Sequence, residues 1–571
     1  MRRTIRLRLR FLSGVLLFFA LLLIARLYFL QVVHGEEYVL KAERQYASGA
    51  GELYDRGSIY FTRKDGTLIS AATLLTGFTL ALNPSLLEDA EAAYAALSKI
   101  ISLPRDDFFA RAAKTDDPYE ELLRHVSEED GKAMAALAIP GVVVARERWR
   151  VYPADARGAQ SVGFTAFGAD DAYRGRYGLE RYYDDLLDRT GGVFGNFFAE
   201  LFTSVESVVV DARRARAGDL LTGVEPVVAE RLANVLAEVH AAYASAETGG
   251  IIMDAKTGTI VALDVLPSFD PNHLSEGNPE YFGNPLVEHV YEFGSIMKPL
   301  TMAAGLDAGV ITSASRYTDE GCVHLNTSTF CNFDGKARGT VPVQEILSQS
   351  LNVGAAHIAG LLGHERMRSY FTALGFGKET GIDLPNETHG ITDNLESPRD
   401  IEYATAAFGQ GIAVTPVEMI RALGALANGG EIVTPRIGTA VRLESGIVKH
   451  FALAPAERIF KEAVVEETTR MLVTVVDTAL AHGTLSIPEM SVAAKTGTAQ
   501  IPGPSGGYYE DRYFHSFFGY FPAYDPRYII LLYTREPKGV QYASETLSNP
   551  FMDLAHFLIS YYAIPPDRAP L

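Results

Sequence analysis

The chain is short of positive charge. Its 571 residues include 51 lysines and arginines against 70 aspartates and glutamates, which gives a net charge of −19 at pH 7. A protein that binds nucleic acid needs a basic face for the phosphates. The charge balance therefore argues against nucleic acid as the partner, although five arginines stand among the first ten residues.

Cysteine is also scarce, since Cys322 and Cys331 are the only two in the chain. They flank a short polar stretch. A local disulfide is the first hypothesis, and two unpaired thiols are the alternative. A zinc site that uses His324 is disfavoured, because three ligands spread over about ten residues lack the paired spacing of zinc sites.

Long apolar runs are absent except near the amino terminus. An uncharged run extends from Phe11 to Ala25 and resumes briefly after Arg26. Counted through Arg26, it has about the ~20 residues needed to cross a bilayer, and Arg26 lies near enough to the far end to reach the headgroups. We expect a transmembrane anchor over 11–32, with the tail 1–10 in the cytoplasm and the rest outside. A cleaved signal peptide is the alternative, but no clear small-x-small cleavage site follows.

The length predicts two to four domains, and the 47% hydrophobic and 21% charged content is that of a packed globular protein. Residues 33–218 contain a helical pattern at 86–101 and a strand pattern at 141–145, with no repeat and no catalytic set. We interpret them as an α+β pedestal or interaction module. Basic residues and glycine at 213–219 suggest a boundary, which leaves 219–571 as a second domain.

The sequence pattern of this second domain predicts an α+β fold, in which helices enclose a mainly antiparallel sheet. The sheet's first strands would stand at the start of the domain and its last strands at the end. The elements behind this prediction are a helix at 225–244, apolar runs at 249–253 and 259–263 joined by a hairpin turn at 254–258, and a strand at 528–533.

A serine and a lysine stand three residues apart in an apolar run. On a helix Lys298 would share a face with Ser295 and reach its oxygen. Pro299 is tolerated only near a helix start, so the helix must begin within about a turn of Ser295. Burial among apolar neighbours would lower the pKa of Lys298, and the neutral amine could take the Ser295 proton. The plain alternative is a capping serine beside a lysine that extends to solvent.

Ser350 and Asn352 form a second element, at the end of a helical stretch. Functionally, Ser350 would relay a proton toward a leaving amine, while Asn352 would hold Lys298 and a substrate amide. Serine and asparagine are also common at helix ends, which is the structural alternative.

A Lys-Thr-Gly-Thr sequence occurs twice, at Lys256 and at Lys495. The first copy forms the hairpin turn, where Lys256 would project into solvent. The second follows a strand pattern. There Lys495 could pair with a substrate carboxylate. The hydroxyls of Thr496 and Thr498 could donate hydrogen bonds to the same carboxylate, and Gly497 would let the substrate backbone approach closely. The N–H of Thr498 would form an oxyanion hole together with the N–H of Ser295.

These three elements, in this order, are the signature of penicillin-binding proteins and serine β-lactamases. Further matches run from the anchor nearly to the carboxyl end, among them Arg56-Gly57-Ser58-Ile59, Tyr177-Gly178-Leu179-Glu180, Phe408-Gly409-Gln410-Gly411 and His515-Ser516-Phe517-Phe518-Gly519. The chain thus resembles a class B penicillin-binding protein. It departs from the family at Phe61-Thr62-Arg63-Lys64-Asp65-Gly66 and at Leu221-Thr222-Gly223-Val224-Glu225, both outside the three motifs.

The resemblance implies a D,D-transpeptidase of peptidoglycan synthesis in the bacterial cytoplasmic membrane, made of an anchor, a dimerisation-type pedestal and a penicillin-binding transpeptidase domain. Ser295 would attack the D-Ala-D-Ala carbonyl of a stem peptide, and β-lactams would acylate the same serine. No metal or organic cofactor is implied. The implied partner is a membrane glycan polymerase of the SEDS family, and the subtype looks more like division than elongation.

Other functions remain open at this point. The three motifs do not separate a transpeptidase from a D,D-carboxypeptidase or a β-lactamase, although the anchor and pedestal favour the transpeptidase. A β-lactam sensor should carry a cytoplasmic signalling domain, and only about ten residues precede the expected anchor. A non-enzymatic scaffold could have lost a motif residue, and none is missing.

Overall fold

The computed structural model describes residues 55–168, 173–189, 217–504 and 506–568. The chain divides into two compact units. The smaller is built around Leu74–Arg150, and the larger combines Gly57–Thr73, Val151–Asp188 and Asp211–Leu571. The expected pedestal segment 33–218 thus contributes to both units. A single boundary at residue 218 stays a prediction, because residues 190–216 lie outside the described part.

The smaller unit packs helices on an antiparallel sheet. Strand β2 (Leu68–Leu82) pairs with β3 (Glu120–Val126) and with β4 (Val142–Val151). The helix expected at 86–101 is shorter. It begins after Asp89, whose carboxylate caps the first turn of α3 (Ala90–Leu97). Helices α4 (Arg105–Ala112) and α5 (Glu128–Ala136) complete the unit, and the side chains of its core include Phe78, Leu80, Leu97, Phe108 and Met134.

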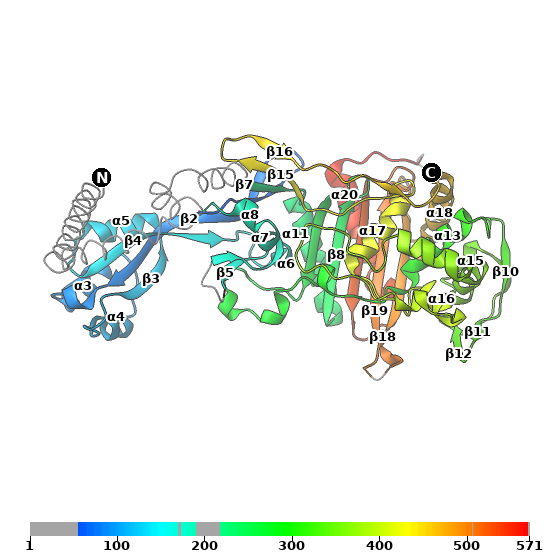
Figure 1. Cartoon of the computed structure of the whole chain (residues 1–571), viewed down its shortest axis with the longest axis horizontal. Helices are drawn as coiled ribbons and strands as arrows, with labels where there is room; N and C mark the ends of the chain where they lie inside the picture. The colour runs from blue at the N-terminus through cyan, green and yellow to red at the C-terminus, as the bar shows by residue number, and fades with distance from the viewer. Residues whose placement is uncertain (1–54, 169–172, 190–216, 505, 569–571) are drawn as a thin grey trace, which may run out of the picture. The chain divides into compact units, whose positions relative to one another are not determined.

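A five-stranded antiparallel sheet forms the centre of the larger unit, in the order β18-β19-β20-β8-β9. Figure 1 shows β8 from the start of the domain in the same layer as β18 and β19 from its end, as the sequence predicts. The strands are β8 (Glu247–Asp254), β9 (Ile260–Leu266), β18 (Ala493–Pro502), β19 (Tyr508–Phe521) and β20 (Tyr528–Arg535).

Helices cover both faces of this sheet. Ile530 and Leu532 of β20 share a core with α11 (Pro226–Tyr243) and α20 (Ser548–Tyr562). The alternating residues Ile529 and Leu531 belong to the other core, together with α13 (Lys298–Asp307), α17 (Pro416–Ala427) and α18 (Glu462–Thr474). A strand buried on both faces is continuously apolar, which explains the unbroken run in β20.

Other strands of the larger unit form a separate sheet and short hairpins. Within this unit β1 (Ile59–Thr62) pairs with the start of β2 and, in parallel, with β7 (Gly218–Thr222), which pairs with β15 (Gly438–Leu443). This parallel pairing joins residue 59 to residue 220, and it explains why an early segment folds with the larger unit.

The remaining elements of the larger unit near the site are β10 (Arg316–Asp319), β11 (Cys322–Leu325), β12 (Ser328–Cys331), β13 (Gly339–Pro342), α14 (Gln344–Ser348), α15 (Asn352–Ala373), α16 (Asp400–Ala406) and α19 (Ala543–Thr546).

Among the described residues, no helix is both long enough and apolar enough to cross a bilayer. The expected tail 1–10 and anchor 11–32 lie outside the described residues, so both stay predictions.

Candidate active site

Ser295 lies in a 3-10 turn (Gly294–Met297) that leads directly into α13. The prediction of a helix that begins within a turn of Ser295 is confirmed. Because that turn places the two side chains on one side, Lys298 Nζ lies 3.0 Å from Ser295 Oγ.

Lys298 is 1% exposed, and its amine is surrounded by polar groups. Its Nζ donates to the Ser350 carbonyl oxygen at 2.6 Å and to Asn352 Oδ1 at 2.8 Å, and it lies 3.2 Å from Ser350 Oγ. Burial, and then the charge of Lys495, lower the pKa of Lys298 well below its usual value. In the neutral form, two N–H groups serve the two shortest contacts and leave the lone pair for Ser295.

Ser350 lies between α14 and α15, and Asn352 begins α15. Ser350 has a left-handed backbone with φ of 55°, an unusual conformation for a residue with a side chain, and such backbones cluster at functional sites. Asn352 is the first residue of α15, and its Nδ2 donates to the Cys331 carbonyl at 2.9 Å. This bond fixes the amide so that its oxygen faces Lys298.

Lys495 lies on β18, the edge strand of the sheet, and is 3% exposed. Its Nζ donates to Ser350 Oγ and to the Thr496 carbonyl, both at 3.1 Å. Burial lowers the pKa of Lys495 to about 7. Lys298, Ser350 and Lys495 therefore form one continuous chain of polar contacts that ends at Ser295.

The look-alike Lys256 lies in the turn between β8 and β9. Its side chain is half exposed, and its ammonium lies 3.7 Å from Asp525. Lys495, and not Lys256, therefore lies beside Ser350, which is the copy that chain order favours.

Gly497 lets β18 pack directly against the segment before Ser295. A Cβ at Gly497 would lie 2.3 Å from Ser516 Oγ and 2.4 Å from the Phe293 carbonyl oxygen. On its Cβ side Gly497 therefore packs against the protein's own groups, and the close approach of a substrate backbone stays a prediction. A Cβ at Gly294 would likewise lie 2.7 Å from the Thr498 carbonyl oxygen. The close fit aligns the Ser295 turn with the edge of β18.

The hydroxyl of Thr498 accepts a hydrogen bond from the Ala543 N–H at 3.0 Å and retains its own proton for donation. Thr496 and Thr498 are both partly exposed on the edge strand. The structure thus brings all eight residues of the three motifs together: Ser295, Lys298, Ser350, Asn352, Lys495, Thr496, Gly497 and Thr498.

A disulfide joins Cys322 and Cys331, as the first sequence hypothesis expects. It links the two strands of the β11–β12 hairpin, where the two cysteines are directly paired. The hairpin therefore carries the Cys331 carbonyl that holds Asn352.

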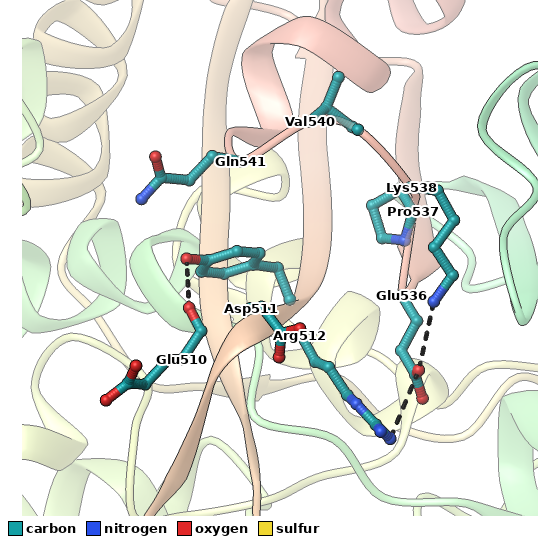
Figure 2. Close-up of a pocket in the computed structure, with 10 residues that line it drawn as sticks. Glu510, Asp511, Arg512, Glu536, Pro537, Lys538, Val540 and Gln541 are labelled. Atoms are coloured by element: carbon teal, nitrogen blue, oxygen red, sulfur yellow. Dashed lines mark hydrogen bonds and ion pairs between the residues drawn. The ribbon is translucent and has the colours of Figure 1, made fainter.

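A hollow of about 600 Å³ lies between the start of β19 and the loop that follows β20. In Figure 2, Glu536 stands between Arg512 and Lys538, at 3.8 Å and 3.7 Å. None of the eight motif residues lines it. The Gln541 carbonyl at the end of this loop accepts a hydrogen bond from His515 Nε2 at 3.0 Å, and Ala543, two residues further on, donates to Thr498 Oγ1.

Sequence reasoning missed Glu292, three residues before Ser295, whose partly buried carboxylate contacts two other segments of the site. Nothing in its spacing marks it as functional, because both partners lie more than a hundred residues away. It also missed His515 as an individual residue. Burial lowers the pKa of His515 to about 4, so this ring is neutral.

A buried lysine within reach of a serine at the start of a helix is the arrangement of a serine acyl-transfer enzyme. Comparison with known proteins specifies the class. Residues 248–555 match the family model described as the penicillin binding protein transpeptidase domain. The chain belongs to this family, as a class B penicillin-binding protein.

The similarity to curated relatives extends beyond that domain. The chain is 28% identical over 560 residues to stage V sporulation protein D of Bacillus subtilis, which covers 96% of this chain and 84% of the relative. It is 26% identical over 465 residues to the peptidoglycan D,D-transpeptidase FtsI of Escherichia coli K12, which covers 80% and 74%.

Solved structures share the fold. Penicillin binding protein 2X from Streptococcus thermophilus aligns with a TM-score of 0.73 at 21% identity, over 90% of this chain and 81% of that one. Penicillin binding protein 3 from Mycobacterium tuberculosis, complexed with aztreonam, aligns with a TM-score of 0.68 at 21% identity, over 90% and 97%.

Proposed function

We propose that this protein is a peptidoglycan D,D-transpeptidase that works through an acyl-enzyme on Ser295. The observation that carries the proposal is the 3.0 Å contact between Ser295 Oγ and the buried Lys298 amine. The names of the curated relatives support the substrate class.

In the first half-reaction Lys298 takes the Ser295 proton as Oγ attacks the carbonyl of the D-Ala-D-Ala bond. The N–H groups of Ser295 and Thr498 stabilise the oxyanion. The C–N bond then breaks, and the terminal D-alanine leaves with a proton that passes from Lys298 through Ser350. An ester on Ser295 remains.

In the second half-reaction an amine from a neighbouring stem peptide attacks the ester. Lys298 accepts the amine proton and returns a proton to Ser295 Oγ as the ester C–O bond breaks. The product is a new amide, the cross-link. Before acylation, Lys495, with the hydroxyls of Thr496 and Thr498, pairs with the terminal carboxylate of the donor peptide, which departs with the released D-alanine.

β-Lactams acylate the same serine in this proposal, and the fold is that of proteins solved with aztreonam and ampicillin. The proposal includes the anchor 11–32, a single pass with the amino terminus inside, and a SEDS-family polymerase as partner through the anchor and pedestal. A role at division rests on the Ser516–Gly519 resemblance and on the FtsI relatives.

The test is to incubate purified protein with a D-Ala-D-Ala stem peptide and a D-amino acid as acceptor. We expect the acceptor to replace the terminal D-alanine. Hydrolysis without exchange would overturn the transferase and support a carboxypeptidase instead. The Ser295→Ala variant is the control for background turnover.

A further inference from the structure

Glu292 stands where three segments of the site meet. Its Oε1 accepts a hydrogen bond from the Gly411 N–H at 2.9 Å and one from the Tyr508 hydroxyl at 3.2 Å. Gly411 belongs to the loop before α17, and Tyr508 is the first residue of β19, in the hairpin that β18 and β19 form. Glu292 itself precedes the Ser295 turn.

Neighbouring hydrogen bonds connect the same three segments. The Gly294 N–H donates to the Gly409 carbonyl at 3.0 Å, and Ser516 Oγ donates to the Phe293 carbonyl at 2.8 Å. The carbonyl oxygen of Gly411 in turn accepts a hydrogen bond from Asn394 Nδ2. Glu292 is therefore the one side chain of the 292–294 segment that bonds to both the loop and the hairpin.

Among the described residues, Glu292 Oε2 is buried and has no hydrogen-bond partner. A buried carboxylate oxygen without a partner costs stability, so what Glu292 contributes lies in the two bonds that Oε1 accepts. Burial raises the pKa of Glu292 to about 7 despite the two bonds, so that the protonated acid, with Oε1 still an acceptor, is also accessible.

We propose that Glu292 is a positioning residue for acylation, which holds the Gly411 loop and the β18–β19 hairpin against the Ser295 turn. We call Glu292, Gly411 and Tyr508 the carboxylate clamp. The clamp keeps the edge of β18, with the Thr498 N–H, in register with Ser295. This inference rests on the proposed function for its kinetic part only.

The kinetic test compares Glu292→Ala, Glu292→Gln and Tyr508→Phe for acylation by penicillin, with the rate constant and the binding constant measured separately. Glu292→Ala should lower the acylation rate constant about tenfold or more, with little change in binding, because small misplacements of reacting groups are costly. Glu292→Gln keeps an oxygen for both donors and should stay within about threefold of wild type.

Tyr508→Phe should lower the rate and add nothing further in the Glu292→Ala background, because both changes break the same bond. The matched control is Tyr509→Phe, a neighbouring tyrosine on β19 whose hydroxyl forms no hydrogen bond among the described residues. Equal rates for Tyr508→Phe and Tyr509→Phe would overturn the clamp even if Glu292→Ala failed to fold.

Amide hydrogen exchange provides a test of the clamp that does not depend on enzyme activity. Glu292→Ala should speed exchange of the Gly411 amide and of the first residues of β19, and unchanged exchange at both places would contradict the clamp. If wild type is not acylated by penicillin, the proposed function fails, while the exchange result still decides whether Glu292 holds the two segments.

Discussion

Two lysines share one serine oxygen at the centre of the site. Lys298 Nζ and Lys495 Nζ lie 3.2 Å and 3.1 Å from Ser350 Oγ, and both amines are almost fully buried. Two ammonium groups this close repel each other, and burial disfavours both charges. One amine is therefore neutral and suited to act as base, and the other keeps its charge for an anionic partner.

The pH dependence of acylation follows from this division. The pKa of Lys495 is lowered to about 7, so its amine is charged below that pH and neutral above it. Binding of a ligand carboxylate needs the charge. The second-order acylation constant for penicillin, which reports the free enzyme, should therefore fall as the pH rises above 7.

The bound ligand provides the control for this prediction. Its carboxylate raises the pKa of Lys495, so the acylation rate at saturating penicillin should not show the same fall. A second-order constant that stays flat between pH 7 and pH 9 would contradict the assignment of Lys495.

Among individual residues, the sequence predicted the contacts between side chains that are close together along the chain. Ser295 and Lys298 are one helical turn apart, and the geometry of a turn dictates their contact. The left-handed backbone of Ser350 and the bonds of Glu292 could not be predicted, because both depend on residues distant along the chain. The packing of Gly497 against Phe293 and Ser516 could not be predicted for the same reason.

At the level of secondary structure, β18 and the disulfide-linked β11–β12 hairpin position two of the three motifs. β18 carries Lys495 at the edge of the sheet, and the hairpin holds Asn352 through the Cys331 carbonyl. The strong strands β8, β9 and β20 were predicted from their continuous apolar runs. The pairing of β1 with β7 was not, because it joins residues some 160 positions apart and leaves no local signal.

Removing the disulfide should destabilise the larger unit. The bridge closes a loop with a sequence separation of 9, and loop closure of this length contributes about 2–3 kcal/mol in the chain-entropy model. The double variant Cys322→Ser and Cys331→Ser should lose about that much free energy of unfolding, measured by urea denaturation.

Thr327→Ser, an exposed change in the turn of the same hairpin, is the matched control and should unfold like wild type. If the double serine variant unfolds at the same urea concentration as wild type, the bridge does not stabilise the unit.

At the scale of the whole molecule, the proposal combines a membrane anchor with a catalytic domain outside the membrane. Removing residues 1–34 should release the chain from membranes that retain the full chain through a high-salt wash, because a run of about 20 apolar residues supplies the insertion energy. Fractionation followed by fluorescent penicillin labelling measures both position and activity.

The released chain should still be labelled, because every motif residue lies beyond position 290. The full chain with Ser295→Ala should remain in the membrane fraction without label. A truncated chain that stays with washed membranes would contradict the anchor at 11–32.

Ser295 is the nucleophile of the proposed reaction, and peptide mapping by mass spectrometry after reaction with penicillin identifies the acylated residue. We expect a penicilloyl adduct on Ser295 in the wild-type chain and no adduct in Ser295→Ala. An adduct on another residue, or adduct formation that persists in Ser295→Ala, would contradict it.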